Sequence, residues 1–591
     1  MQQPRQIVVI VLMLLVAGLA ACDRKVERPP AVADPSTKRA TQSGDIIGAK
    51  GDYGDHVWRG IPYAAPPVGP LRWRAPEPPA PWMGTREMLQ FGAPCVQFAN
   101  NFGGVPGKEG SVGGSEDCLF LNVYAPAVPI EQVPSGATRL PVMVWIHGGG
   151  NTIGHAGFYN GGNLASTGRV VVVTLNYRLG PFGWLRHAAL REGLTPEEQS
   201  GNFALLDLIQ ALHWVQGNIA AFGGDPTTVT IFGESAGAQN VFALLLAPQA
   251  RGLFHRAIAQ SGGLWTSSPP EGENLREATP PGDARSSAEL LLTLLERDGT
   301  ASDRAAAKQH LATLSAADVA AYLRGTPSAA LLAAYEPFPG NGMFEMPRMF
   351  ADGAVLPQDD PLALYARADR WNSVPVMVGT TRDESKLFMF GDPQLVRRYF
   401  GLFPRLRDER MYNLTSEYMA KMWKATGADM PAAAMSTVQP QVFVYRFDWD
   451  EEPTILGADL SVMLGAAHIF EVPFVFGHFD LGKDGNVIFT ENNQAGRTEL
   501  SRAMMDYWAG FARYGQPAHG DKPAPEWTAW DPLSPNSPKF AILDTKAGGG
   551  VRMSNETLTA VGVMEALYAD PRLQEPREEC KPFPYDTFPW S

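Results

Sequence analysis

The chain has 591 residues, of which 45% are hydrophobic and 10% aromatic, with 60 glycines and 50 prolines spread along its length. This composition is that of a globular protein with many turns, and it excludes collagen-like, coiled-coil and low-complexity chains. The formal net charge is −13 and no run rich in lysine and arginine appears, so the chain is not expected to bind nucleic acid.

The first residues have the pattern of an export signal. Residues 7–21 are apolar and follow Arg5, and a stretch of this length suits the core of a signal peptide better than a transmembrane helix. The stretch leads into the letters LAAC, which resemble a bacterial lipobox and end at Cys22. We therefore expect a signal peptide over residues 1–21, a lipid on Cys22, and an exported protein of the periplasm or cell envelope that this lipid anchors to a membrane. The alternative is ordinary cleavage beside an incidental cysteine.

Beyond the signal, the chain divides into a spacer, one large domain and a tail. Residues 22–43 are polar and contain prolines, which is typical of a flexible linker. Over residues 44–575, strand-like and helical stretches alternate without a long polar linker, and we expect a single domain there. Residues 576–591 then form a C-terminal tail.

Segments in the first half of this domain predict its fold. Residues 141–146 and 170–175 are short, β-branched and almost wholly apolar, as strands buried on both faces of a sheet must be. Residues 202–222 have the apolar spacing of a helix, and residues 228–232 are again strand-like. The alternation predicts an α/β fold with a central, mostly parallel sheet flanked by helices. The middle segment, residues 269–324, is rich in Ala, Leu and Glu and predicts a helical insertion.

A candidate nucleophile follows the strand expected over residues 228–232. The letters GESAG at residues 233–237 match G-x-S-x-G, and the helix-compatible run AQNVFALLLA comes next. Between a strand and a helix, this pattern is typical of a sharp turn that presents a serine hydroxyl above the sheet. The helix N-terminus adds partial positive charge near that hydroxyl. The bare pattern often occurs by chance, but this context identifies Ser235 as the candidate nucleophile.

A second glycine-rich turn, HGGG at residues 147–150, follows the strand expected over residues 141–146. Attack of a serine on an acyl carbon passes through a tetrahedral oxyanion, which needs backbone N–H donors without side chains in the way. Consecutive glycines allow that approach. A phosphate-binding loop is disfavoured because no Lys-Ser or Lys-Thr pair follows the glycines.

A serine nucleophile needs a base, and the base needs an acid, in the chain order serine, acid, histidine for this kind of turn. The histidines that follow the serine are His255, His310, His468, His478 and His519. His468 is the candidate base because it follows a turn of small residues, which leaves its ring on a loop at the sheet edge. The strand-like residues 374–379 lead to Asp383 and Glu384, and residue chemistry alone leaves both open as the acid.

The cysteines indicate a disulfide and no metal site. Cys95 and Cys118 bracket a short glycine-rich loop, and in an exported protein we expect them to form a disulfide that contributes about 3 kcal/mol. Metal binding is not expected, since neither Cys-x-x-Cys nor His-Glu-x-x-His occurs. Cys580, in the tail, has no assigned role.

Several longer motifs together resemble one family. FGGDPTTVTIFGESAGAQNV, SEDCLFLNVYAP, GIPYAAPPVGPLRWRAPEP, NYRLGPFGWL and VGTTRDESKLF are similar to type-B carboxylesterases, the α/β-hydrolases that also include cholinesterases. The similarity runs from about residue 44 to about residue 567 and is weakest in the helical middle segment and the tail. It implies an α/β-hydrolase fold with a catalytic domain over residues 44–575. It also implies a serine carboxylic ester hydrolase that works through an acyl-enzyme on a small-molecule ester, without a cofactor.

The same resemblance implies roles for individual residues. Ser235 would be the nucleophile, His468 the base, and Glu384 rather than Asp383 the acid. The implied oxyanion hole consists of the N–H groups of Gly149, Gly150 and Ala236, and Cys95–Cys118 matches the family's first disulfide.

The sequence departs from the family pattern at two places. Ile469 follows His468 where the family usually has glycine. The loop between Cys95 and Cys118 lacks the tryptophan that cholinesterases use against choline, so acetylcholine is not expected as a substrate. Candidate pocket residues, by their position near motifs, are Phe98, Asn151, Trp265, Phe388 and Phe390. The alternatives are a lipase, polymer-ester hydrolase or amidase at the same site, or an adhesion module on the same fold; the natural ester and the oligomeric state stay open.

Overall fold

The computed structural model describes residues 30–100, 105–399, 403–519, 522–523, 527–534 and 536–573. The signal peptide expected over residues 1–21, the lipid site at Cys22 and the tail with Cys580 lie outside the described residues. Within the described ranges, no helix is long and apolar enough to cross a membrane.

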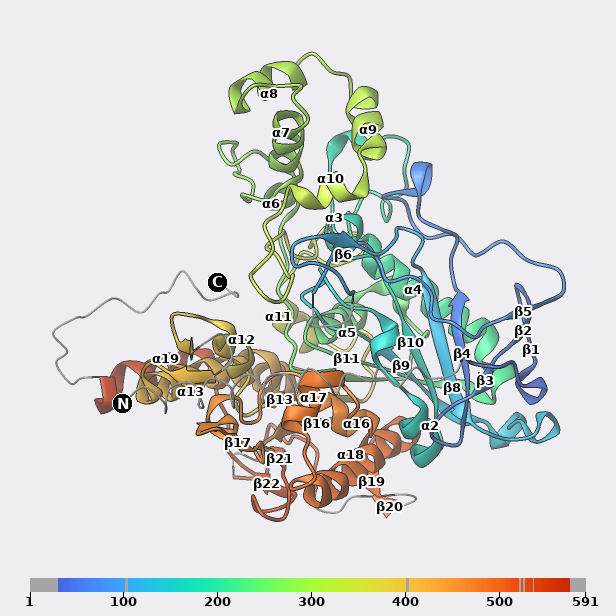
Figure 1. Cartoon of the computed structure of the whole chain (residues 1–591), viewed down its shortest axis with the longest axis vertical. Helices are drawn as coiled ribbons and strands as arrows, with labels where there is room; N and C mark the ends of the chain where they lie inside the picture. Colours follow the sequence, from blue (N-terminus) through green and yellow to red (C-terminus); the bar gives the residue numbers. More distant parts are fainter. Residues whose placement is uncertain are drawn as a thin grey trace, which may run out of the picture. The chain divides into compact units, whose positions relative to one another are not determined.

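An 11-stranded sheet forms the centre of the compact unit that begins at Ala33 (Figure 1). Its strands lie in the order β22-β21-β16-β13-β12-β11-β9-β10-β8-β4-β3. Neighbouring strands from β21 to β10 are parallel, whereas β22 at one side and β8, β4 and β3 at the other pair antiparallel. The predicted mostly parallel sheet is confirmed. Its strands are β3 Ala49–Lys50, β4 Asp55–Pro62, β8 Phe120–Pro126, β9 Leu140–Ile146, β10 Val171–Leu175, β11 Gly224–Glu234, β12 Arg256–Gln260, β13 Val376–Thr381, β16 Val442–Phe447, β21 Phe540–Leu543 and β22 Arg552–Ser554.

Helices cover the sheet and explain the composition of its central strands. Every residue of β9 and of β10 is buried, as their apolar sequences predict for strands covered on both faces. Val142, Val144, Val171 and Val173 belong to the main hydrophobic core. The helices of the domain are α2 Gly162–Gly168, α3 Gly180–Gly183, α4 Phe203–Asn218, α5 Ala236–Leu246, α6 Pro269–Glu273, α7 Ser287–Arg297, α8 Arg304–Leu311, α9 Ala316–Gly325, α10 Ser328–Ala333, α11 Pro361–Tyr365, α12 Lys386–Gly391, α13 Glu409–Lys424, α14 Met430–Met435, α15 Leu460–Met463, α16 Val472–Phe476, α17 Gly482–Ile488, α18 Gln494–Tyr514 and α19 Ala560–Ala569.

The helical insertion predicted over residues 269–324 is confirmed. Helices α6 to α10 gather at the top of the view in Figure 1, away from the main body of the sheet. Within it, Leu292 and Leu295 of α7 form a small hydrophobic core with Ala301 and Ala307. Each of α7, α8 and α9 starts at a serine or aspartate whose side chain accepts a hydrogen bond from a backbone N–H group of the first turn.

The described residues also form several small sheets outside the central one. A 3-stranded sheet joins β1 Arg39–Thr41, β2 Gly44–Ile47 and β5 Thr85–Glu87, and two-stranded pairs are formed by β6 Gln97–Phe98 with β7 Val112–Gly113, β14 Val396–Tyr399 with β15 Phe403–Leu406, β17 Thr454–Ile455 with β18 Ala458–Asp459, and β19 Ala518–His519 with β20 Lys522–Pro523.

The ordered unit starts earlier than the sequence predicts. Residues 22–43 were expected to form a flexible linker, but the compact unit begins at Ala33. Strand β1 pairs with β2, and Thr37 just before it is fully buried. The carbonyl of Thr37 accepts a hydrogen bond of 2.7 Å from Nε1 of Trp58, and the guanidinium of Arg39 lies 5.0 Å from the Trp58 ring centroid. The expected boundary at residue 44 is therefore wrong for residues 33–43, which are tied to the domain through backbone pairing and one tryptophan.

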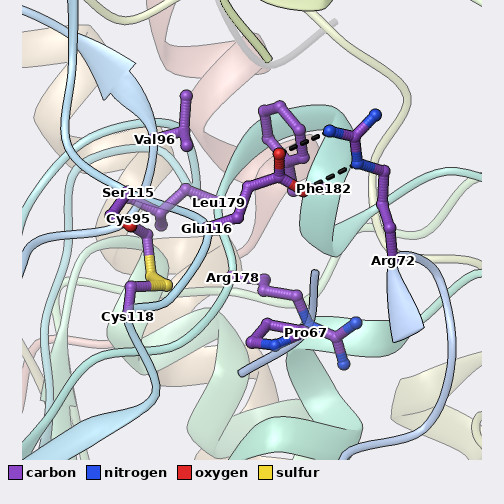
Figure 2. A pocket seen from close by; sticks show the side chains of 10 residues that line it. All are labelled: Pro67, Arg72, Cys95, Val96, Ser115, Glu116, Cys118, Arg178, Leu179 and Phe182. Carbon is purple, nitrogen blue, oxygen red and sulfur yellow. Dashed lines mark hydrogen bonds and ion pairs between the residues drawn. A yellow bond between two sulfur atoms is a disulfide. The ribbon is translucent and has the colours of Figure 1, made fainter. Parts of the chain in front are cut away.

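The Cys95–Cys118 disulfide is present and closes a loop with a sequence separation of 23. Figure 2 shows it near a small cavity that is also lined by an ion pair, in which Nε of Arg72 lies 2.7 Å from Oε2 of Glu116. The cavity has a volume of about 10 Å³, which is room for about one water molecule. It is a packing feature beside two cross-links rather than a substrate site.

Candidate active site

The candidate nucleophile lies in a strained turn at the end of a central strand. Strand β11 ends at Glu234 and helix α5 begins at Ala236, so Ser235 makes the whole turn, with φ 56° and ψ −123°. This conformation is unfavourable for any residue except glycine, and strain of this kind costs about 1–3 kcal/mol. A Cβ atom at Gly237 would lie 2.0 Å from the carbonyl oxygen of Ile146, so only glycine allows this close approach of helix and strand.

The glycine turn after β9 lies beside this serine. A Cβ atom added to Gly148 would come within 3.0 Å of the Ser235 Cβ atom. Gly149 and Gly150 have φ angles of 95° and 61°, and a Cβ atom at Gly149 would meet the Ile153 carbonyl at 2.4 Å. Throughout the part of the chain that the structure describes, no group accepts a hydrogen bond from the N–H groups of Gly149, Gly150 or Ala236. Within the described residues these three N–H groups are therefore free to donate, as the donors of an oxyanion hole must be.

The candidate base and acid meet at the same edge of the sheet, because the carboxyl ends of parallel strands lie together there. Nδ1 of His468 lies 2.6 Å from Oε2 of Glu384, and both side chains are buried. The other carboxylate oxygen, Oε1, accepts a hydrogen bond of 2.8 Å from the Thr381 N–H group. This leaves the carboxylate held at both oxygens and the imidazole held at one nitrogen.

The neighbouring carboxylate, Asp383, faces elsewhere. Its Oδ2 accepts a hydrogen bond of 3.1 Å from the N–H group of Ala466, in the turn before the histidine. It also pairs with Nη2 of Arg382 at 2.8 Å and with Nζ of Lys386 at 3.0 Å. Of the two acids that residue chemistry left open, Glu384 contacts the imidazole, while Asp383 joins the acid loop to the histidine loop.

A second buried carboxylate faces the imidazole. Oε1 of Glu234 lies 3.0 Å from Nε2 of His468, at ion-pair distance but outside hydrogen-bond geometry. Burial disfavours the imidazolium, but the charges of Glu234 and Glu384 raise the pKa of His468 well above its usual value. Burial also raises the pKa of Glu234. The Ser235 hydroxyl makes no hydrogen bond within the described residues; such bonds often form only when substrate binds.

Glu471 completes this acidic group. It is fully buried, and its Oε1 lies 3.3 Å from Nε2 of Gln260, whose own side-chain oxygen accepts a hydrogen bond from Trp508. Burial, followed by the charges of Glu234 and Glu384, raises the pKa of Glu471 to about 8. Glu471 is therefore mainly neutral at pH 7. Sequence reasoning missed both Glu234 and Glu471, and the available signal was a lone carboxylate within each of two apolar runs.

Aromatic rings cover the imidazole. The ring centroids of Phe388 and Trp423 lie 5.4 Å and 4.8 Å from that of His468. Phe388 was a candidate pocket residue, whereas Trp423, from the last turn of α13, was missed. Phe390 instead packs with the β14–β15 hairpin, and Phe98 packs edge-on against Phe344 at 5.6 Å.

Asn151 and His478, which the sequence also offered as candidates, each contact another side chain. Oδ1 of Asn151 accepts a hydrogen bond of 2.9 Å from Asn240, and Nδ1 of His478 lies 2.7 Å from the Tyr53 hydroxyl. Over the described ranges, no group of three or more His, Cys, Asp and Glu side chains could hold a metal ion. The site thus offers a serine, an imidazole, carboxylates and backbone donors, which is the equipment of acyl transfer.

Comparison with known proteins agrees with this geometry. The model of the carboxylesterase family matches residues 35–422 and 393–560. The chain belongs to the carboxylesterase family. It is 34% identical to para-nitrobenzyl esterase of Bacillus subtilis over 535 residues, which are 86% of this chain and 94% of that protein. It is 35% identical to fumonisin B1 esterase of Sphingopyxis macrogoltabida over 83% of this chain and 84% of that protein, and 33% identical to human cocaine esterase over 83% and 86%.

Solved structures give the same answer for this carboxylesterase. A para-nitrobenzyl esterase structure matches with a TM-score of 0.61 at 31% identity, covering 88% of this chain and 97% of that one. A carboxylesterase of Geobacillus stearothermophilus matches with a TM-score of 0.60 at 30% identity, covering 88% and 98%. The fold is that of the α/β-hydrolases, and the protein is a carboxylic ester hydrolase.

Proposed function

We propose that this carboxylesterase works through an acyl-enzyme formed on Ser235, with His468 as general base and Glu384 as the orienting acid. The observation that carries the proposal is the 2.6 Å contact between Nδ1 of His468 and Oε2 of Glu384, beside a serine held in a strained strand-to-helix turn. A strained turn persists only where the surrounding structure holds it, which supports Ser235 as the site of chemistry over an ordinary surface serine.

In the acylation step, Oγ of Ser235 attacks the ester carbonyl carbon as Nε2 of His468 takes the hydroxyl proton. Glu384 holds the imidazole at Nδ1, which leaves Nε2 to take the proton, and it stabilises the imidazolium that forms. The negative charge that develops on the carbonyl oxygen is bound by the N–H groups of Gly149, Gly150 and Ala236. The imidazolium then returns its proton to the departing alcohol. Water attacks the acyl-serine by the same base, which releases the carboxylic acid and restores the serine.

The proposed substrate is a small-molecule carboxylic ester. Three relatives are named for esters of this kind: para-nitrobenzyl esters, fumonisin B1 and cocaine. The aromatic rings of Phe388 and Trp423 beside the imidazole favour an apolar group next to the scissile bond. Lipase, polymer-ester and amide hydrolysis are the competing activities of the same site, and a pure adhesion role is disfavoured because the serine, imidazole and carboxylate are all present.

The test is burst-phase hydrolysis of a short and a long p-nitrophenyl ester by the enzyme and by Ser235→Ala. We expect a burst of one p-nitrophenol for each enzyme molecule, and a loss of about 10⁶-fold in kcat in the variant. Faster turnover of the short ester than of the long one supports a carboxylesterase over a lipase. Hydrolysis of the p-nitroanilide with the same acyl group tests for amidase activity. Equal rates for enzyme and variant on both esters would contradict the proposal.

We further propose that the protein is exported and that a lipid on Cys22 anchors it to a membrane of the cell envelope. The apolar core at residues 7–21 and the LAAC letters support this, and the Cys95–Cys118 disulfide fits an oxidising compartment. Labelling of cells with a palmitate analogue tests it. We expect label on the full chain and none on Cys22→Ser, while label on both would contradict lipidation at this cysteine.

A further inference from the structure

Two neighbouring hairpins form a cationic and apolar surface, defined here as the arginine surface. It consists of Arg397, Tyr399, Arg405 and Leu456. Residues 396–407 read VRRYFGLFPRLR, with four arginines and no acidic residue, in a chain whose net charge is −13. Part of this segment forms the β14–β15 hairpin. The β17–β18 hairpin lies against it, because Nη2 of Arg405 donates a hydrogen bond of 2.8 Å to the carbonyl of Leu456.

Strand register directs the two arginines of the arginine surface to the same side. Arg397 pairs directly with Arg405 across the hairpin, and Tyr399 pairs with Phe403. The alternate positions Val396 and Leu406 face inward, where they pack in a small hydrophobic cluster. Like charges that face each other across an antiparallel pair destabilise it. The fold therefore tolerates an unfavourable cation pair on the outward face.

The arginines of these hairpins have no carboxylate partner. In the part of the chain that the structure describes, Arg397, Arg398, Arg405 and Arg407 form no ion pair with an acid. The guanidinium of Arg397 lies 4.7 Å from the ring centroid of Tyr399, and the other three donate hydrogen bonds to backbone carbonyls. Their positive charge is left for an external anion.

Three acids that lie near these hairpins in the chain are engaged with the backbone. Oδ1 of Asp392 accepts a hydrogen bond of 2.7 Å from an N–H group two residues on, and Oδ1 of Asp408 accepts one of 2.9 Å at the start of α13. Oδ1 of Asp459 does the same at the start of α15, at 3.1 Å. These carboxylates stabilise turns and helix starts rather than the arginines.

The tip of the second hairpin is an exposed leucine in an unfavourable conformation. Leu456 and Gly457 form its two-residue turn, with φ angles of 48° and 77°. Positive φ at both positions is the type I′ turn, which favours asparagine before glycine. Leu456 is instead 71% exposed, and Ile455 beside it is 38% exposed. An apolar tip is thus kept at a position where a polar residue would be both more soluble and less strained.

We propose that the arginine surface docks on an anionic phospholipid bilayer. Arginines next to an aromatic ring and an exposed aliphatic side chain are the chemistry that binds headgroup phosphates and enters the interface. The net negative charge of the chain does not prevent this, because salt screens charges beyond about 8 Å under physiological conditions and local cations decide. This contact is separate from the lipid proposed on Cys22.

The position of the arginine surface gives the docking a use. Helix α12 joins the loop of Glu384 to β14, and α15 joins β18 to the loop of His468. Phe390 and Leu406 of β15 pack both with Val396 of β14 and with Ala458 of β18. A membrane held at this surface therefore lies beside the two loops that carry the candidate acid and base, where esters that partition into the bilayer collect.

Vesicle flotation tests the proposal, with the chain lacking residues 1–29 so that no N-terminal lipid contributes. This unit contains the whole sheet and its core, and it corresponds to 97% of a solved esterase, so it is expected to fold alone. We expect it to float with phosphatidylglycerol vesicles, to lose binding as salt rises, and not to float with phosphatidylcholine vesicles. Each arginine should contribute about fivefold to binding, so Arg397→Gln/Arg405→Gln should weaken it about 25-fold. The control Arg367→Gln/Arg502→Gln removes the same charge elsewhere and should bind within about twofold of the parent.

Leu456→Asn separates binding from folding. Asparagine suits the turn, so the melting temperature should rise, while loss of the apolar tip should weaken binding about tenfold. Equal binding to both kinds of vesicle, or equal loss in the arginine variant and its control, would overturn the proposal. Binding to neither vesicle would also overturn it and would assign the surface to a protein partner or to a second copy of the chain.

Discussion

The two carboxylates around His468 predict an unusual pH dependence, and Glu234→Gln tests it. Oε1 of Glu234 lies 3.0 Å from Nε2 of the imidazole. At an effective dielectric constant of about 20, two unit charges at that distance interact by about 5 kcal/mol. Burial raises the pKa of Glu234 because it disfavours the charged carboxylate. Because a nearby negative charge favours the imidazolium, we expect Glu234→Gln to lower the pKa of His468.

The sign follows from the proposed role of the imidazole as a base. His468 must be neutral to accept the serine proton, and its raised pKa means that activity is lost as pH falls through a value above the usual one of about 6.5. In Glu234→Gln, the acid limb of kcat/KM should move toward lower pH. The plateau at high pH should fall, because the less basic imidazole is a weaker base and its cation loses one stabilising charge.

The assay is kcat/KM for a soluble ester, measured by pH-stat titration at a series of pH values that spans the acid limb of the profile. Glu471→Gln is the matched control, because the pKa of Glu471 is about 8 and its carboxyl is already mainly neutral below that pH. We expect the control to keep the parent acid limb. An unmoved limb in Glu234→Gln, or an equal shift in Glu471→Gln, would refute the electrostatic reasoning.

Further predictions concern the loops around the site. Ile469 has φ 74°, a conformation that favours glycine. In urea unfolding, Ile469→Gly should therefore be more stable than Ile469→Ala by about 1 kcal/mol, although alanine is usually the more stabilising residue. A more stable Ile469→Ala would contradict backbone strain at this position. Asp383→Ala should lower kcat at least tenfold, because the loop of His468 loses its hydrogen bond from the Ala466 N–H group. Asp383→Asn should restore part of the activity, since its side-chain oxygen can still accept that bond. An unchanged kcat in Asp383→Ala would exclude a role for Asp383 in positioning the histidine loop. Cys95→Ala/Cys118→Ala, which opens a loop of separation 23, should lose about 3 kcal/mol of unfolding free energy, and an unchanged value would show that the loop is held otherwise.

The parts of the fold that the sequence predicts are those with a local physical signature. Strands β9 and β10 read as apolar runs because they are covered on both faces. The turn around Ser235 is recognisable because its close backbone approach excludes any residue but glycine at Gly237. Strand β1 has no such signature, because its polar residues are ordered by pairing with β2 rather than by their own burial pattern.

The parts that escape prediction depend on segments distant in the chain. Asp383 and Glu384 are chemically alike, and only the path of the loop after β13 directs one toward the imidazole and the other toward the Ala466 N–H group. Glu234 comes from a strand far from His468 in the chain, so its own sequence does not show that it will face the imidazole. Glu471 is only three residues from His468, but nothing local shows that its carboxyl will be fully buried. Likewise, the spacing of the arginines in the sequence does not show that Arg397 and Arg405 pair directly across a hairpin.

The order in which the sheet is assembled has a consequence for the timing of activity. Strands β9 and β11 and the serine turn lie in the first half of the chain, whereas the acid and base come from loops after β13 and β16, and β16 is itself flanked by β21 near the C-terminal end. A ribosome-bound or partly translocated chain that has emerged only as far as α5 carries the serine without its acid or base. Under the proposed mechanism, such a chain does not hydrolyse esters, and neither does any fragment that lacks the residues after β13. Ester cleavage by this mechanism therefore requires the finished fold.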